Sequence, residues 1–173
     1  MRGIKYIGCI ILIGVGIYTA LFFREETKKQ EIKEKEIQLY EKKKIEDTDV
    51  LGMIEIVKTN KKSLIKKGNV NTIIAQNQVA SMTQNLDIKQ TIFLAGHSIP
   101  SVFGDLHQSQ IGDRIILLIQ EKVYHYTIES IRTVRTDDFT PLEAEYKYPQ
   151  LVLITCTNRS SIRLLVFAKL TDD

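Results

Sequence analysis

The stretch LVLITCTNRSSIRLLVFAKL, from Leu151 to Leu170, holds two apolar runs joined by a short polar loop. Short runs rich in Leu, Val and Ile, bounded by polar residues, predict two adjacent antiparallel strands. Cys156 ends the first run and Arg163 opens the second, so the hairpin is expected to bring thiol and guanidinium together. By composition alone, a lone cysteine is more often a small buried apolar residue than a nucleophile. The stretch therefore predicts a strand pairing but leaves the role of the thiol open.

The chain upstream of this hairpin, from about residue 50, repeats the same pattern of short apolar or alternating runs. These runs are VLGMIEIVK, NTIIAQ, QTIFLAG, DRIILLIQ and KVYHYTIESIRTV. Turns are predicted at Gly112-Asp113 and at Gln120 to Lys122. About seven or eight short strands at this spacing favour an antiparallel sandwich or a closed barrel over an α/β fold.

The N-terminal part of the chain differs from the rest in composition. Residues 6–23 carry no charge and are just long enough to cross a bilayer as a helix. Residues 1–23 therefore predict an uncleaved signal anchor, with the N-terminus inside and the rest of the chain outside the cell. A cleaved signal peptide is the alternative, although no small-x-small site follows the apolar run. Residues 24–49 alternate Lys and Glu and predict a polar stalk or a partly disordered linker, which leaves 50–173 as the folded domain.

Charge and cysteine content narrow the functional classes. The net charge of +3 is too small to indicate a nucleic-acid-binding protein. Cys9 lies in the apolar segment, so residues 50–173 contain Cys156 alone and have no internal disulfide. A lone thiol in an oxidising compartment is a liability unless it is buried or used.

Three polar residues stand at the ends of predicted strands. His97 follows IFLAG, and Cys156 and Arg163 flank the hairpin loop. A cysteine nucleophile needs a proton-transfer partner, and acyl transfer needs a donor for the developing oxyanion. These three residue types supply those roles, although the sequence alone does not place His97 near the other two. His125 is interpreted as structural and His107 as a loop residue.

Several segments resemble the conserved blocks of the Gram-positive sortases, in the same order. They are LAGHS at 94–98, FGDL at 103–106, IGDRIIL at 111–117 and LVLITC…RLLVFAKL, preceded by GMIEI at 52–56. The resemblance covers the whole domain from about Val50. It implies a closed eight-stranded β-barrel with short helices and the activity of a cysteine transpeptidase.

The resemblance also implies a role for each site residue. Cys156 is the nucleophile, His97 the general acid and base, and Arg163 stabilises the oxyanion or holds the sorting signal. Thr155, in the same block, is assigned to substrate binding. The family cleaves an LPxTG-like signal between Thr and Gly, and an amine of peptidoglycan or of a pilin lysine resolves the thioester. No metal or organic cofactor is required; some sortases bind calcium, but no acidic cluster of this chain is assigned to it.

The chain departs from the family pattern in ways that concern substrate preference. Val152 replaces a usual Thr, the first strand lacks an Ile-Pro segment, and the cysteine-to-arginine loop is short. No second apolar span and no long lid segment are seen. These features favour a housekeeping or specialised anchoring enzyme over a doubly anchored pilin polymerase. The alternatives are a non-enzymatic surface β-domain with a buried Cys156, and a hydrolytic cysteine peptidase.

Overall fold

The computed structural model describes residues 24, 38–40, 42, 49–157 and 161–171. Within these residues no helix has the length and apolar character needed to cross a membrane. The predicted anchor at 1–23 lies outside the described residues, as does most of the predicted linker at 24–49. Both therefore stay predictions. The strands all belong to one compact unit, Lys42–Asp173.

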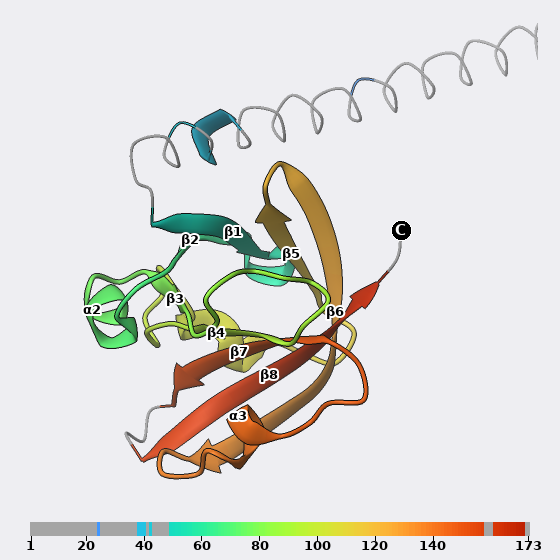
Figure 1. Cartoon of the computed structure of the whole chain (residues 1–173). Helices are drawn as coiled ribbons and strands as arrows, with labels where there is room; N and C mark the ends of the chain where they lie inside the picture. The colour runs from blue at the N-terminus through green and yellow to red at the C-terminus, as the bar shows by residue number, and fades with distance from the viewer. Residues whose placement is uncertain (1–23, 25–37, 41, 43–48, 158–160, 172–173) are drawn as a thin grey trace, which may run out of the picture. The chain divides into compact units, whose positions relative to one another are not determined.

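The described residues of this unit form a closed β-barrel of eight strands (Figure 1). Around the barrel the strands follow the order β1-β2-β3-β4-β7-β8-β6-β5. Neighbouring strands are antiparallel except for the parallel pairs β2–β3 and β4–β7. The predicted mainly β architecture with a closed barrel is thus confirmed. The strands are β1 (Val50–Ile56), β2 (Lys61–Lys66), β3 (Val79–Ser81), β4 (Ile92–Ala95), β5 (Arg114–Ile119), β6 (Lys122–Arg135), β7 (Gln150–Cys156) and β8 (Ile162–Thr171).

The sequence pattern did not predict two of the strands, and one segment predicted as a strand is a helix. β2, KKSLIK, is largely polar and buries only Ile65, while β3 has three residues. The segment NTIIAQ was predicted as a strand, which is wrong: it forms most of α2 (Val70–Ala75). Asn69 caps this helix because its side chain accepts a hydrogen bond from the Thr72 N–H. Short apolar runs do not distinguish a strand from a buried helix turn.

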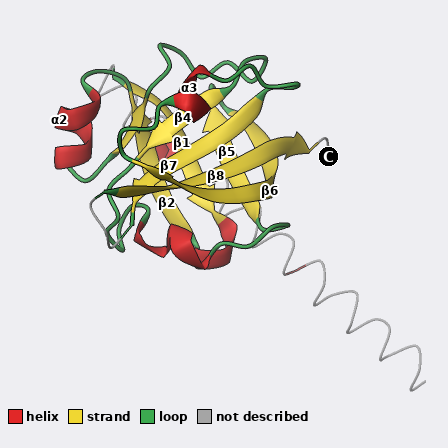
Figure 2. Ribbon diagram, turned by 90° about the horizontal axis from the view of Figure 1, so that it is seen from below, coloured by secondary structure: helices red, strands yellow, loops and turns green. Residues whose placement is uncertain are grey.

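The sheet formed by β4, β7 and β8 is buried on both faces. Its inner face belongs to the barrel core, which includes Leu94, Leu153 and Val166. Its outer face carries a second apolar cluster, made of Ala95, Val152, Ile154, Leu165 and Phe167. Side chains of α2 and of α3 (Thr140–Glu143) pack on this outer cluster, and Figure 2 shows both helices outside the barrel. Because strand side chains alternate, successive residues of β7 face different surroundings.

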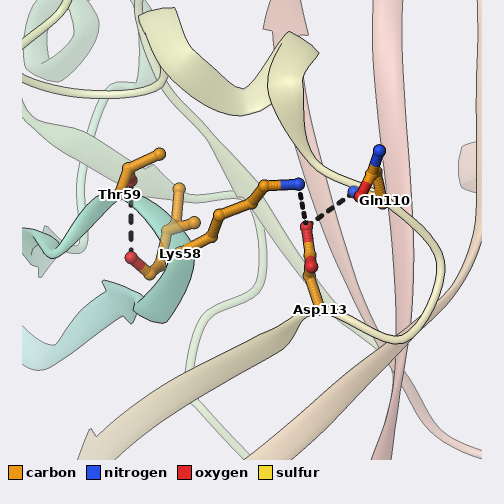
Figure 3. Close-up of polar contacts among 5 residues, drawn as sticks. Lys58, Thr59, Gln110 and Asp113 are labelled. Atoms are coloured by element: carbon orange, nitrogen blue, oxygen red, sulfur yellow. Dashed lines mark hydrogen bonds and ion pairs between the residues drawn. The ribbon is translucent and has the colours of Figure 1, made fainter.

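The 3-10 helix η1 (Val57–Thr59) is tied to the turn before β5 (Figure 3). Lys58 Nζ lies 3.1 Å from the Asp113 carboxylate, which also accepts a 2.7 Å hydrogen bond from the Gln110 N–H. Burial works to raise the pKa of Asp113, but the Gln110 N–H and the Lys58 ammonium outweigh it and leave that pKa lowered. Gly112, with φ of +92°, makes the predicted turn at Gly112-Asp113. The contact joins the β1–β2 hairpin to the start of β5.

Candidate active site

Cys156 and Arg163 lie directly opposite each other at one end of the β7–β8 pair. They are Cα partners in the antiparallel register, and beyond them the Thr157 N–H donates a 3.0 Å hydrogen bond to the Ile162 carbonyl. Directly opposed residues of an antiparallel pair project their side chains to the same face. Ile154 and Leu165, two residues away on each strand, belong to the outer cluster. The thiol and the guanidinium therefore both belong to the outer face of the sheet.

His97 reaches the same face from the neighbouring parallel strand. The β4–β7 register pairs Phe93 with Val152 and Ala95 with Ile154. Extended by two residues, this register sets His97 level with Cys156. Phe93 and Ala95 pack in the outer cluster, so alternation also turns His97 outward. Three adjacent strands thus bring together the three residues that the sequence proposed for chemistry.

Two hydrogen bonds hold the segment that carries His97. The Gly96 N–H donates to the Ile154 carbonyl at 3.0 Å, and Thr155 Oγ1 donates to the Gly96 carbonyl at 2.9 Å. Thr155 is 4% exposed, and it lies between Ile154 and the nucleophile candidate. Its hydroxyl therefore positions the residue that precedes His97. Contact of Thr155 with a substrate stays a prediction.

The turn after His97 is fixed by close packing on Gly96. A Cβ at Gly96 would lie 2.6 Å from Phe103 Cδ2 and 2.9 Å from Val102 Cγ1, so only glycine fits under these side chains. The Phe103 N–H also donates a 3.1 Å hydrogen bond to the His97 carbonyl. Gly96 is buried while His97 is exposed. The backbone at this point is thus anchored while the imidazole is accessible.

Cys156 lines two cavities. The outer cavity, of about 280 Å³, contains His97, Cys156 and Arg163 among largely apolar side chains. The end cavity, of about 470 Å³, contains Cys156 together with several hydroxyl side chains and His107. Cys156 is exposed, which contradicts the alternative that it is a buried core residue. The remaining lining of the outer cavity is Val70, Asn71, Ile74, Met82, Ala95, Gly96, Leu142, Ile154 and Thr155.

Sequence reasoning missed one aromatic neighbour of the site. Arg163 Cζ lies 6.0 Å from the centroid of the Phe139 ring, at the outer limit of a cation–π contact. Phe139 is the N-cap of α3 and is 52% exposed. Nothing in the local sequence pattern marks it. The Phe139 ring therefore lies on one side of the guanidinium.

The other titratable candidates have different surroundings. His125 lies within β6, where its carbonyl accepts a 3.0 Å hydrogen bond from Thr171 Oγ1. His107 belongs to the 3-10 helix η2 (Gly104–Gln108) and lines the end cavity. No group of three or more His, Cys, Asp or Glu residues suited to a metal ion occurs among the described residues. The loop TNRSSI includes residues 158–160, which lie outside the described part, so its predicted influence on signal preference stays a prediction.

A family model described as a sortase domain matches residues 54–171, so the chain belongs to the sortase family. Members of this family are cysteine transpeptidases. No curated protein sequence matches the chain significantly.

Solved sortase structures share the fold. A lid mutant of sortase A from Corynebacterium diphtheriae is 25% identical, with a TM-score of 0.64 and coverage of 72% of this chain and 71% of that one. Clostridium perfringens sortase C, solved with the C-terminal cell wall sorting motif, is 28% identical, with a TM-score of 0.64 and coverage of 72% of both chains. Streptococcus pneumoniae sortase C is 23% identical over 72% of this chain and 70% of that one, with a TM-score of 0.64, and supports the fold alone.

Proposed function

We propose that the chain is a membrane-anchored sortase-type transpeptidase that transfers a protein bearing an LPxTG-like sorting signal to an amine of the cell wall or of a pilin. The observation that carries the proposal is the exposed Cys156 thiol, which shares one cavity with His97 and Arg163. Nucleophile, proton-transfer group and cation then come from three adjacent strands. The family membership supports acyl transfer as the reaction type.

In the first half-reaction, the Cys156 sulfur attacks the carbonyl carbon of the signal's Thr–Gly bond. The developing oxyanion accepts hydrogen bonds from the Arg163 guanidinium, whose fixed fork of donors suits an oxygen anion. His97 gives its proton to the departing glycine amine, the C–N bond breaks, and a thioester remains on Cys156. In the second half-reaction, an amine displaces the sulfur and His97 regains a proton. His97 therefore alternates between acid and base.

The outer cavity is the proposed site for the sorting signal. Its apolar lining, from Val70 and Ile74 of α2 to Leu142 of α3, suits a leucine and a proline side chain better than a charged segment. A glycine and a thioester carbonyl would then lie beside Cys156. The solved sortase C that contains a sorting motif supports this substrate class.

The acceptor and the location of the enzyme are proposed on separate grounds. Solved structures of similar fold include sortases of both the A and the C class, so wall and pilin amines are both retained as acceptors. The apolar segment at 6–23 supports a single membrane anchor with the barrel outside the cell. Membrane fractionation of the full chain against a variant lacking residues 2–23 tests the anchor. The deletion is expected to move the protein to the soluble fraction, and an unchanged membrane association would contradict it.

Three alanine variants test the assignment of roles. With an LPxTG-containing peptide and triglycine as acceptor, Cys156→Ala is expected to abolish transfer, and His97→Ala and Arg163→Ala to remove most of it. His125→Ala is the control, because that side chain lies on β6 and is interpreted as structural. Wild-type rates in His97→Ala or Arg163→Ala, with product identity verified by mass spectrometry, would remove that residue from its role.

A further inference from the structure

The two cavities approach Cys156 from different faces of the same sheet. Ile154 of β7 packs in the outer cluster and lines the outer cavity. Leu164 of β8 pairs in register with Thr155 of β7 on one side and with Thr133 of β6 on the other, and all three residues line the end cavity. Leu164 belongs to the barrel core, so these three residues mark the inner face. Cys156 is the last residue of β7, where inner and outer faces meet.

Polar side chains line the end cavity beside apolar ones. The end cavity contains the hydroxyls of Ser98, Thr133 and Thr157 and the imidazole of His107, together with the apolar side chains of Phe103, Ile162 and Leu164. No Lys, Arg, Asp or Glu is among the described residues that line the end cavity. Hydroxyl oxygens and a neutral imidazole nitrogen accept hydrogen bonds from an amine or ammonium group.

The tautomer of His107 follows from its partner. His107 Nδ1 lies 2.6 Å from the Gly104 carbonyl oxygen. A carbonyl oxygen can only accept, so Nδ1 is assigned as the protonated nitrogen. In the neutral ring, Nε2 then keeps a lone pair that can take up a proton. No local sequence pattern singles out this histidine, because the tautomer depends on the position of one backbone carbonyl.

That carbonyl is held by close packing of the loop after β4. The Gly104 N–H donates a 2.7 Å hydrogen bond to the Ile99 carbonyl. A Cβ at Gly104 would overlap the Ile99 carbonyl carbon, so the close approach of these two backbone segments requires glycine. Leu106, between Gly104 and His107, is fully buried. The orientation of the His107 ring is therefore set by backbone that has little freedom to shift.

We propose that the end cavity binds the acceptor amine and that His107 Nε2 removes the proton which keeps this amine from attacking. The proposal rests on the proposed function, because it concerns the second half of that reaction. The donor signal then occupies the outer cavity and the acceptor the end cavity, on either side of the thioester sulfur. One reactant need not leave the site for the other to approach.

His107 and His97 take different protons from the acceptor nitrogen. An alkylammonium acceptor gives one proton to His107 Nε2 and becomes a neutral amine. Its nitrogen lone pair attacks the thioester carbonyl carbon, the C–N bond forms, and the C–S bond breaks with its electron pair left on the Cys156 sulfur. The second proton of the attacking nitrogen goes to His97, which lost its own proton in the first half-reaction. His107 releases its proton to solvent, so both residues and the thiolate return to their starting states.

The proposal makes the effect of His107 depend on the acceptor. Alkyl amines are mostly protonated near neutral pH, with a pKa of about 10.4 for a lysine side chain and about 7.7–8.0 for an α-amino group. Water and hydroxylamine, by contrast, are neutral near neutral pH and carry no ammonium proton that must be lost before attack. The proton that each releases on attack goes to His97, as the second proton of the amine does. Loss of His107 should therefore impair transfer to amines but not hydrolysis or transfer to hydroxylamine.

The test measures the kcat/KM of the full chain for four acceptors at a saturating concentration of an LPxTG-containing peptide. The acceptors are triglycine, Nα-acetyl-lysinamide, hydroxylamine and water. For each amine that the wild type uses, His107→Ala is expected to lower kcat/KM at least tenfold, with hydroxylamine transfer and hydrolysis within twofold of wild type. His107→Gln, which preserves bulk but has no basic nitrogen, is expected to show the same loss. His125→Ala serves as the matched control and is expected to leave the values for all four acceptors unchanged.

Three other outcomes of this assay would contradict the proposal. An equal loss with every acceptor would place His107 in acylation or in the fold, and no loss with amines would remove it from acceptor chemistry. If the wild type transferred to neither amine, the end cavity would not be an amine site. Failure of the proposed function is recognised separately, by peptide cleavage that persists in Cys156→Ala or by no cleavage in the wild type.

Discussion

The hydroxyl of Thr155 is expected to matter for activity through His97. Replacing Thr155 with valine keeps the side-chain volume but removes the donor that lies 2.9 Å from the Gly96 carbonyl. Both residues are buried, so this carbonyl cannot recover the bond from bulk water. Leaving a buried carbonyl without its hydrogen bond costs about 1–3 kcal/mol. The free energy of unfolding should fall by that amount.

Activity should fall by more than stability explains. Gly96 directly precedes His97, so a shift of its carbonyl moves the imidazole relative to Cys156. Misplacement of a catalytic group by about 1 Å can cost about 100-fold in rate, so a shift of a fraction of that distance is expected to lower kcat/KM by about tenfold. The matched control is Thr155→Ser, which retains the donor and loses a methyl group at a cost of about 0.5–1.5 kcal/mol. The serine variant should thus lose stability but retain most of its activity.

Unfolding in urea, followed by far-ultraviolet circular dichroism because the chain has no tryptophan, gives the stability of each variant. Transfer of an LPxTG-containing peptide to triglycine gives kcat/KM. Wild-type kcat/KM in Thr155→Val would refute the positioning role of the hydroxyl. An equal loss of activity in the serine and valine variants would refute it as well, because the donor is present in only one of them.

Two further predictions concern Arg163 and Asp113. Arg163→Lys keeps the charge but loses the planar fork of donors, so kcat/KM for the signal peptide should fall at least tenfold. The control is Arg132→Lys, which should stay within twofold of wild type; the Arg132 guanidinium lies 5.1 Å from the Phe167 ring centroid. Equal losses in the two variants would contradict the role of Arg163. The folded-state pKa of Asp113 is lowered, so its contribution to stability is present above the unfolded value of about 3.9 and is lost as the pH falls through the folded value. Urea midpoints should show Asp113→Asn less stable than wild type at neutral pH, with the difference shrinking in acid, and a constant difference at all pH values would exclude the linkage.

The sequence predicted those strands whose apolar residues match their burial in the structure. The Leu151–Leu170 hairpin could be inferred because both of its strands are mostly apolar. In the structure these strands are buried on both faces, which explains that composition. The β2 strand could not, because it is polar except at Leu64 and Ile65. The NTIIAQ segment has the composition of a strand, but the Asn69 cap and its packing on the outer cluster make it a helix.

The site was predictable to the extent that it is local in sequence. Cys156 and Arg163 are neighbours because one loop joins their strands. His97 is brought to them by the parallel β4–β7 pairing, in which the Thr155 hydroxyl meets the carbonyl of a residue 59 positions away. No local pattern encodes a pairing of that separation. The two cavities and the tautomer of His107 depend on the same tertiary arrangement. They could therefore not be predicted from the sequence either.

The most direct test of the account is to detect the covalent intermediate. The full chain is mixed with an LPxTG-containing peptide without an added amine, quenched in acid, digested and analysed by mass spectrometry. The account predicts a peptide fragment, ending at the signal's threonine, joined to Cys156 as a thioester that disappears on addition of hydroxylamine. Its absence in a protein that still cleaves the peptide, or continued transfer by Cys156→Ala, would contradict the central claim.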